Sequence, residues 1–67
     1  MSAEQFRYIR VHILELQQVE LAELIGVRSH SVYRYEADLR SIPRMLAMTM
    51  RMLGAIKGTY IGQQFGL

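Results

Sequence analysis

Residues 18–35 read QVELAELIGVRSHSVYRY, and the spacing of small, apolar and glycine residues in this stretch predicts two short helices that cross at a tight turn. Ala22 is small enough to lie where the second helix crosses the first. Gly26 follows four residues later, where glycine adopts a left-handed turn conformation at no steric cost. The residues expected on the inward faces of the two helices are apolar or aromatic: Leu21, Leu24, Ile25, Val27, Val32 and Tyr35.

The remaining sequence predicts one helix before this pair and one after it, so the expected fold class is all-α, a compact bundle of four or five helices. Ser2 and Gln5 have the spacing of a capping box at the start of the first helix. Its apolar residues form two stripes: Phe6, Ile9, Ile13 and Leu16 on one side, and Tyr8, Val11 and Leu14 on the other. The four helices are expected over about residues 3–15, 18–25, 29–37 and 43–56.

The fourth helix is apolar on more sides than one core can cover. Before it, residues 37–42 are expected to form a loop in which Asp38 tolerates a positive φ. Pro43 suits the first turn of the helix and Ser41 its N-cap. Leu46, Met50 and Leu53 share the side that faces the core, and the opposite stripe, which is expected to be a dimer interface, consists of Met45, Met48 and Met52.

We divide the chain into a domain of residues 1–56 and a C-terminal tail of residues 57–67. Glycines punctuate the tail, and its apolar residues have no helical period. The tail is therefore expected to form a short strand or an irregular segment, docked on the domain or extending the dimer interface. The tail residues assigned to that interface are Tyr60, Ile61 and Phe65.

Length and composition indicate one small folded domain. The chain has 67 residues, of which 51% are hydrophobic and 21% are charged. It contains no cysteine, which excludes disulfides and thiolate metal sites and predicts a reducing, cytoplasmic location. No apolar run approaches the roughly 20 residues that span a bilayer, so no membrane association is expected. A domain this small buries little surface alone, and dimerisation is its expected support.

Charge is distributed unevenly along the sequence. Residues 1–27 carry two arginines and four glutamates, whereas residues 28–57 carry five arginines and one lysine against Glu36 and Asp38. Arginine is the planar donor suited to phosphates and guanine edges, so the basic middle of the chain favours a nucleic-acid partner. On charge alone, a solvated basic face is an equal alternative.

The stretch from Leu16 to Val27, together with Ser31-Val32-Tyr33-Arg34-Tyr35-Glu36 and Ile42-Pro43, closely resembles the Cro/C1-type (XRE) family of helix-turn-helix DNA-binding repressors. The resemblance covers roughly residues 3–53 and keeps the family spacing without a gap from Gln18 to Pro43. It implies a homodimer that places its third helix in the major groove of a double-stranded DNA operator.

This sequence departs from the family pattern at three places. Gln17 stands where the family has a Ser or Thr cap before the second helix, which predicts a weaker cap. Leu14-Glu15-Leu16 fills a connection that is one residue longer than usual and lacks the usual glycine. Arg28 replaces a small capping residue before the third helix, so the cap is expected to shift to Ser29.

The resemblance also implies roles for individual residues. Ser29, His30 and Arg34 are expected to read bases, with Tyr33 beside them touching the sugar-phosphate more than the bases. The residues expected to bind backbone phosphates are Gln18, Arg28, Arg40 and Arg44. The alternative for Arg34 is a surface ion pair with Glu36 or Asp38, and the alternative for the other cations is solvation.

Two residues with charged side chains are expected to be structural. Arg10 and Glu36 fall on inward or half-buried faces, and the family often joins such a pair between the first helix and the end of the third. His12 has only Glu15 as a second ligand at helical spacing, so no metal site is expected. No set of side chains suits catalysis and no glycine-rich phosphate loop is present, so no enzyme activity, cofactor or small-molecule substrate is expected.

The expected function is a homodimeric transcriptional repressor that binds an inverted-repeat operator and represses its own operon in a phage or mobile element. The alternative is an antitoxin or anti-regulator, a protein-interaction module that binds a partner protein through the fourth helix and the tail.

Overall fold

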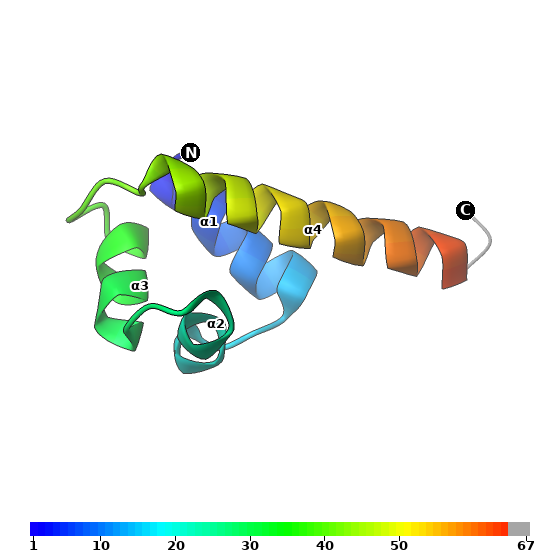
Figure 1. Cartoon of the computed structure of the whole chain (residues 1–67), viewed down its shortest axis with the longest axis horizontal. Coiled ribbons are helices and arrows are strands. Elements are labelled where there is room, and N and C mark those ends of the chain that lie inside the picture. Colours follow the sequence, from blue (N-terminus) through cyan, green and yellow to red (C-terminus); the bar gives the residue numbers. More distant parts are fainter. Residues whose placement is uncertain (65–67) are drawn as a thin grey trace.

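The computed structural model describes residues 1–64, with side chains through Lys57, and this part of the chain is all-helical without a strand. The helices are α1 (Ala3–Tyr8), η1 (Ile9–Leu14), α2 (Gln18–Ile25), α3 (Ser29–Glu36) and α4 (Arg44–Gln64). Helix α4 runs along most of the length of the molecule, with α1 and η1 beneath it and with α2 and α3 on the side away from it (Figure 1). No helix among the described residues has both the length and the apolar character needed to cross a membrane.

The first helix begins as predicted and changes its winding halfway. The capping box is present, since the backbone N–H of Gln5 donates to Ser2 Oγ (3.1 Å) and that of Ser2 donates to Gln5 Oε1 (3.0 Å). From α1 the chain continues directly into η1, a π-helix, in which each turn holds one residue more than an α-turn. Glu15 ends this helix in the left-handed conformation, with φ 56°. The first helical segment therefore ends at Leu14, one residue before the predicted end, and Glu15 adopts a conformation that glycine adopts most readily.

A three-residue turn joins α2 to α3. Gly26 has φ 75°, and the N–H groups of Gly26 and Val27 both donate to the carbonyl of Ala22, the latter at 3.0 Å. Helix α2 spans the predicted residues, and its N-cap Gln17 donates its backbone N–H to Glu20 Oε1 (2.8 Å). The expected shift of the α3 cap to Ser29 is wrong: Arg28 occupies the N-cap position in an extended conformation, without a side-chain cap bond.

The end of α3 matches the prediction for Asp38. This residue has φ 59°, and its N–H donates to the Tyr35 carbonyl at 3.3 Å. The N–H of Leu39 donates to the Arg34 carbonyl at 2.9 Å, which completes a Schellman motif. Because the motif satisfies the last carbonyls of α3, the helix ends at Glu36, one residue earlier than expected.

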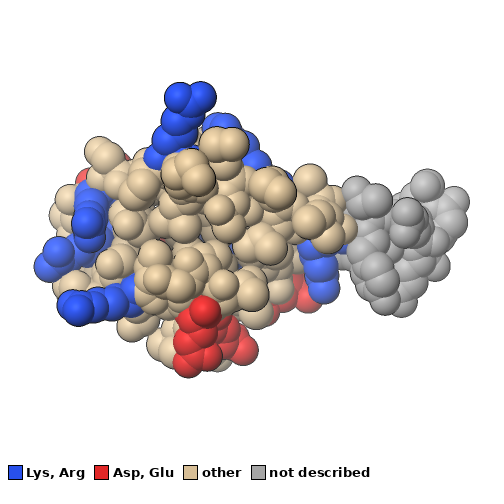
Figure 2. Space-filling view, in the orientation of Figure 1, with Lys and Arg blue, Asp and Glu red and all other residues tan. Residues whose placement is uncertain are grey.

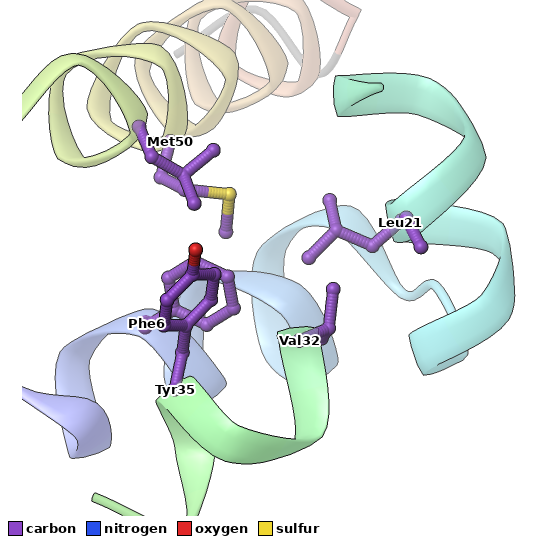
Figure 3. Close-up of a cluster of buried hydrophobic side chains, with 7 residues drawn as sticks. Phe6, Leu21, Val32, Tyr35 and Met50 are labelled. Carbon is purple, nitrogen blue, oxygen red and sulfur yellow. The ribbon is translucent and has the colours of Figure 1, made fainter. Parts of the chain in front are cut away.

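The core lies where all four α-helices meet (Figure 3). The rings of Phe6 and Tyr35 lie 5.8 Å apart with a tilt of 59°, an arrangement favoured by aromatic quadrupoles. Ala22 is 2% exposed, as its small size predicts for a crossing point. Leu24 is 57% exposed, so its predicted burial is wrong, because Leu21 and Ala22 already fill the side of α2 that faces the core. The buried core cluster comprises Phe6, Leu21, Ala22, Val32, Tyr35, Leu46 and Met50.

Helix α4 begins one residue later and ends later than predicted. Pro43 lies directly before it and accepts the N–H of Ala47 at 2.9 Å, and Ser41 makes no side-chain hydrogen bond to any described residue. The helix continues to Gln64, so the predicted boundary after residue 56 falls inside it. The expected strand or irregular segment is therefore wrong for residues 57–64, which are helical. Each glycine lowers helix stability by about 1 kcal/mol, but no proline interrupts the segment.

Gly54 marks the place where α4 crosses η1. A Cβ atom at this position would lie 3.5 Å from Ile9 Cγ2 and 3.8 Å from Ile13 Cδ1. These are ordinary van der Waals distances to two side chains, so an alanine would fit at this crossing. Beyond this crossing, α4 projects past the other helices (Figure 1).

Candidate nucleic-acid interface

The outward face of α3 gathers the residues that were expected to read bases. Ser29, His30, Tyr33 and Arg34 are all exposed, whereas Val32 and Tyr35 of the same eight-residue helix are buried. The rings of His30 and Tyr33 stack at 6.3 Å with 20° between their planes. Because His30 and Arg34 are four residues apart, they lie one above the other on the same side of the helix. The helix thus presents two aromatic rings, two hydroxyls and a guanidinium group to solvent.

Arginine side chains flank this face. Arg28 precedes α3, Arg40 lies in the loop after it, and Arg44 opens α4, and all three are exposed. The guanidinium of Arg40 lies over the Tyr35 ring, 5.8 Å from its centroid, which anchors this loop residue on the core. Lys and Arg side chains gather at the end of the molecule formed by α3 and its loop, and along the side of α4 (Figure 2).

The ion pair offered as the alternative for Arg34 is not formed. Among the described residues, the one ion pair joins Glu36 to Arg10, and neither Glu36 nor Asp38 binds Arg34. The Arg34 guanidinium is therefore exposed and forms no ion pair within the described part of the chain, which leaves it available to contact a ligand.

The structure brings Arg10 and Glu36 together in a largely buried ion pair. Arg10 donates to both carboxylate oxygens, from Nε to Oε2 and from Nη2 to Oε1 at 2.8 Å. Its Nη1 donates to the Leu16 carbonyl at 2.9 Å. The two side chains are only 11% and 5% exposed. One arginine thereby ties η1 both to the last turn of α3 and to the segment before α2, which fixes the orientation of α3.

Gln18, which was expected to bind phosphate, lies beside this ion pair. Its side-chain amide donates to Glu36 Oε1 at 3.1 Å, and the residue is half-buried. A glutamine amide carries two N–H donors, so one remains for a second acceptor. Gln18 is also the first residue of α2, where backbone N–H groups lack intrahelical partners. Gln18 and Arg10 thus both donate to Glu36, at the end of α3.

The outer stripe of α4 lies on the surface, as expected for an interface. Met45, Met48 and Met52 are 75%, 46% and 62% exposed, while Leu46 and Met50 are buried on the opposite side. Ile56, 64% exposed, extends the stripe by another turn and was missed, although its spacing of four from Met52 marks it. The Tyr60 and Ile61 side chains and Phe65 fall outside the described residues.

Two other residues, Leu39 and His12, lie outside the predicted interface. Leu39 is 70% exposed in the loop beside Arg40, and no spacing in the sequence marks it. The His12 ring lies against Tyr8, with 4.9 Å between centroids. Within the described residues, no three His, Cys, Asp or Glu side chains lie together as a metal site would require.

Comparisons with protein-family models, with curated proteins and with solved structures found no match to this chain. Its function is therefore inferred from its own residues and their geometry.

Proposed function

We propose that this chain is a helix-turn-helix transcriptional repressor that binds double-stranded DNA sequence-specifically as a homodimer, with α3 in the major groove. The observation that carries the proposal is the exposed face of α3. Hydrogen-bonding side chains cover this face, arginines flank it, and its own acidic neighbour Glu36 is neutralised by Arg10. A helix of this kind is what major-groove recognition requires.

The connection between α2 and α3 supports this proposal. Gly26 adopts the left-handed conformation in a three-residue turn, and Ala22 is buried beneath the crossing helix. The Arg10–Glu36 pair holds the last turn of α3 against η1. A recognition helix held at a fixed angle loses little conformational entropy on binding, which favours specific recognition.

Within the proposed complex, Arg34 pairs with a guanine through O6 and N7, the commonest specific contact in the major groove. Ser29 and His30, at the start of α3, read neighbouring bases or phosphates, and Tyr33 contacts the backbone beside them. The phosphate contacts come from the exposed cations around α3 and from the N-terminus of α2: Arg28, Arg40, Arg44 and Gln18.

The second copy in the complex is held by the outer stripe of α4. Met45, Met48, Met52 and Ile56 form an apolar strip along the exposed side of this helix, as in self-complementary interfaces. A twofold dimer places its two α3 helices about 34 Å apart, so the operator is an inverted repeat with half-site centres about 10–10.5 base pairs apart. The setting suggested by the family resemblance is repression of its own operon in a phage or mobile element.

Selection of DNA from a random double-stranded pool tests the proposal. The purified chain is expected to enrich an inverted repeat with this spacing. Enrichment of no sequence, or of single asymmetric sites only, contradicts it. The Arg34→Ala variant, selected in parallel, is the control for recognition through α3.

One observation favours a second candidate, a protein-interaction module such as an antitoxin. The exposed methionine stripe of α4 is adaptable apolar surface of the kind that binds partner helices. Sedimentation combined with a DNA shift assay separates the two functions. A chain that stays monomeric and shifts no DNA favours the interaction module, whereas a dimer that shifts DNA favours the repressor.

A further inference from the structure

A hollow between the first helical segment and α4 is an apolar depression that the proposed function leaves unused. It has a volume of about 210 Å³ and is lined by Met1, Gln5, Tyr8, Ile9 and Arg51. This volume suits a single inserted side chain, because sites for drug-sized ligands are typically about 300–1,000 Å³. Tyr8, 59% exposed, lines the hollow, and Arg51 supplies its one charged side chain. The hollow therefore suits an apolar side chain with a carboxylate beside it.

The charges of α4 restrict the occupant further. In the part of α4 with described side chains, the charged residues are Arg44, Arg51 and Lys57, and all three are cations. Arg51 thus has no acidic partner on the described part of its own helix, so a carboxylate that docks beside the hollow can pair with it.

The chain itself carries such a surface on the outward side of α2. Val19 and Leu24 are 56% and 57% exposed, and Glu20 and Glu23 are exposed beside them. At 100° per residue, the two glutamates lie between the two apolar residues on one face of the helix. This helix contains no Lys or Arg. Its outward face therefore combines exposed apolar side chains with the negative charge that suits a hollow beside Arg51.

The two surfaces lie on different sides of the molecule and do not meet within one chain. Acidic side chains gather along the edge formed by α2, and α4 lies along the opposite edge (Figures 1 and 2). A contact between them joins two copies head to tail, in contrast to a twofold interface in which the same patch meets itself.

We propose that the acidic face of α2 (Val19, Glu20, Glu23 and Leu24) docks into the hollow between α1 and α4 of a second copy, with Leu24 against Tyr8 and Ile9 and with Glu23 paired to Arg51. Four side chains on one helix bury much less than the roughly 1,000 Å² of a stable interface, so the contact is weak in solution. Copies held side by side at high local concentration form it readily. The contact requires no DNA and uses none of the α3 residues.

Sedimentation velocity of the intact chain tests this contact, at about 50 mM and about 500 mM salt and at concentrations up to about 1 mM. The weight-average sedimentation coefficient is expected to rise with concentration at low salt, and this rise is expected to shrink at high salt, which screens the Glu23–Arg51 pair. A chain whose coefficient shows no such rise, or the same rise at both salt concentrations, overturns the proposal.

Charge exchange supplies the decisive comparison. Arg51→Glu alone and Glu23→Lys alone are expected to weaken the association at least tenfold, and an equimolar mixture of the two variants is expected to regain it. Arg7→Glu makes the same charge change at an exposed α1 residue that does not line the hollow, and this variant is expected to associate like the parent. Parental association of Arg51→Glu, or failure of the mixture to regain it, overturns the proposal. The interface of a dimer formed through the α4 stripe is apolar, so that dimer persists at high salt. Its lack of salt dependence distinguishes it from the contact between Glu23 and Arg51.

Discussion

Removal of Arg10 is expected to destabilise the fold more than any other single charge deletion in the described part of the chain. In Arg10→Ala, the Glu36 carboxylate loses both of its arginine donors and keeps only Gln18, while the Leu16 carbonyl loses its donor. Breaking a fully buried pair costs about 3–5 kcal/mol. The side chains here are 11% and 5% exposed, so a loss near the lower end, about 3 kcal/mol, is expected.

Urea denaturation at a fixed chain concentration measures this loss. At about 0.05–0.15 kcal/mol per residue, the whole domain has a stability of roughly 3–10 kcal/mol, so the variant is expected to keep roughly 0–7 kcal/mol and to be largely unfolded if the parent lies at the lower end. The exposed Arg34→Ala is the matched arginine deletion and is expected to lie within about 0.5 kcal/mol of the parent. The paired change Arg10→Met with Glu36→Leu leaves no buried charge and is expected to recover most of the loss. If Arg10→Ala melts like the parent yet fails to bind DNA, the structural role is refuted.

Three further predictions concern the turn, the crossing and the interface. Gly26→Ala is expected to lower the free energy of unfolding by about 1–2 kcal/mol, because φ is 75° even though the site is open. Gly54→Ala is expected to raise the free energy of unfolding by about 0.5–1 kcal/mol, because its Cβ has ordinary contact distances within a helix. Thermal melts that rank the two variants the other way contradict the described backbone. Changing Met48 and Met52 together to Glu is expected to yield folded monomers by sedimentation and circular dichroism, and a persistent dimer rules out the α4 stripe as the interface. Arg44→Ala is expected to weaken binding to all DNA sequences alike and to reduce the salt slope by about one counterion, and a parental slope in salt titrations excludes a phosphate contact.

The central helix pair and its turns were predictable because each rests on local chemistry. Glycine at the turn, a small residue at the crossing and an aspartate that tolerates positive φ identify Gly26, Ala22 and Asp38 from spacing alone. The structure confirms all three, since Gly26 and Asp38 have a positive φ and Ala22 is buried. The partners Arg10 and Glu36 were named through the family resemblance, since residues 26 apart in sequence have no local signal that pairs them.

Features that depend on packing between distant segments were not predictable in this way. The change to π-winding at Ile9 has no signal in the apolar periodicity, which predicted one regular helix over about residues 3–15. The extension of α4 beyond Ile56 runs against the low helix propensity of its glycines. The hydrogen bond from Gln18 to Glu36 depends on the relative placement of α2 and α3, which a motif match does not specify.

The most direct test of the central proposal is a comparison of the DNA sequences selected by the parent chain and by Arg34→Ala, followed by binding titrations on the selected operator. The variant is expected to bind that operator about 5- to 150-fold more weakly, which corresponds to a loss of about 1–3 kcal/mol. It is also expected to lose its preference at one base pair in each half-site. An Arg34→Ala variant that selects the same operator with the same preference at every base pair contradicts recognition through α3.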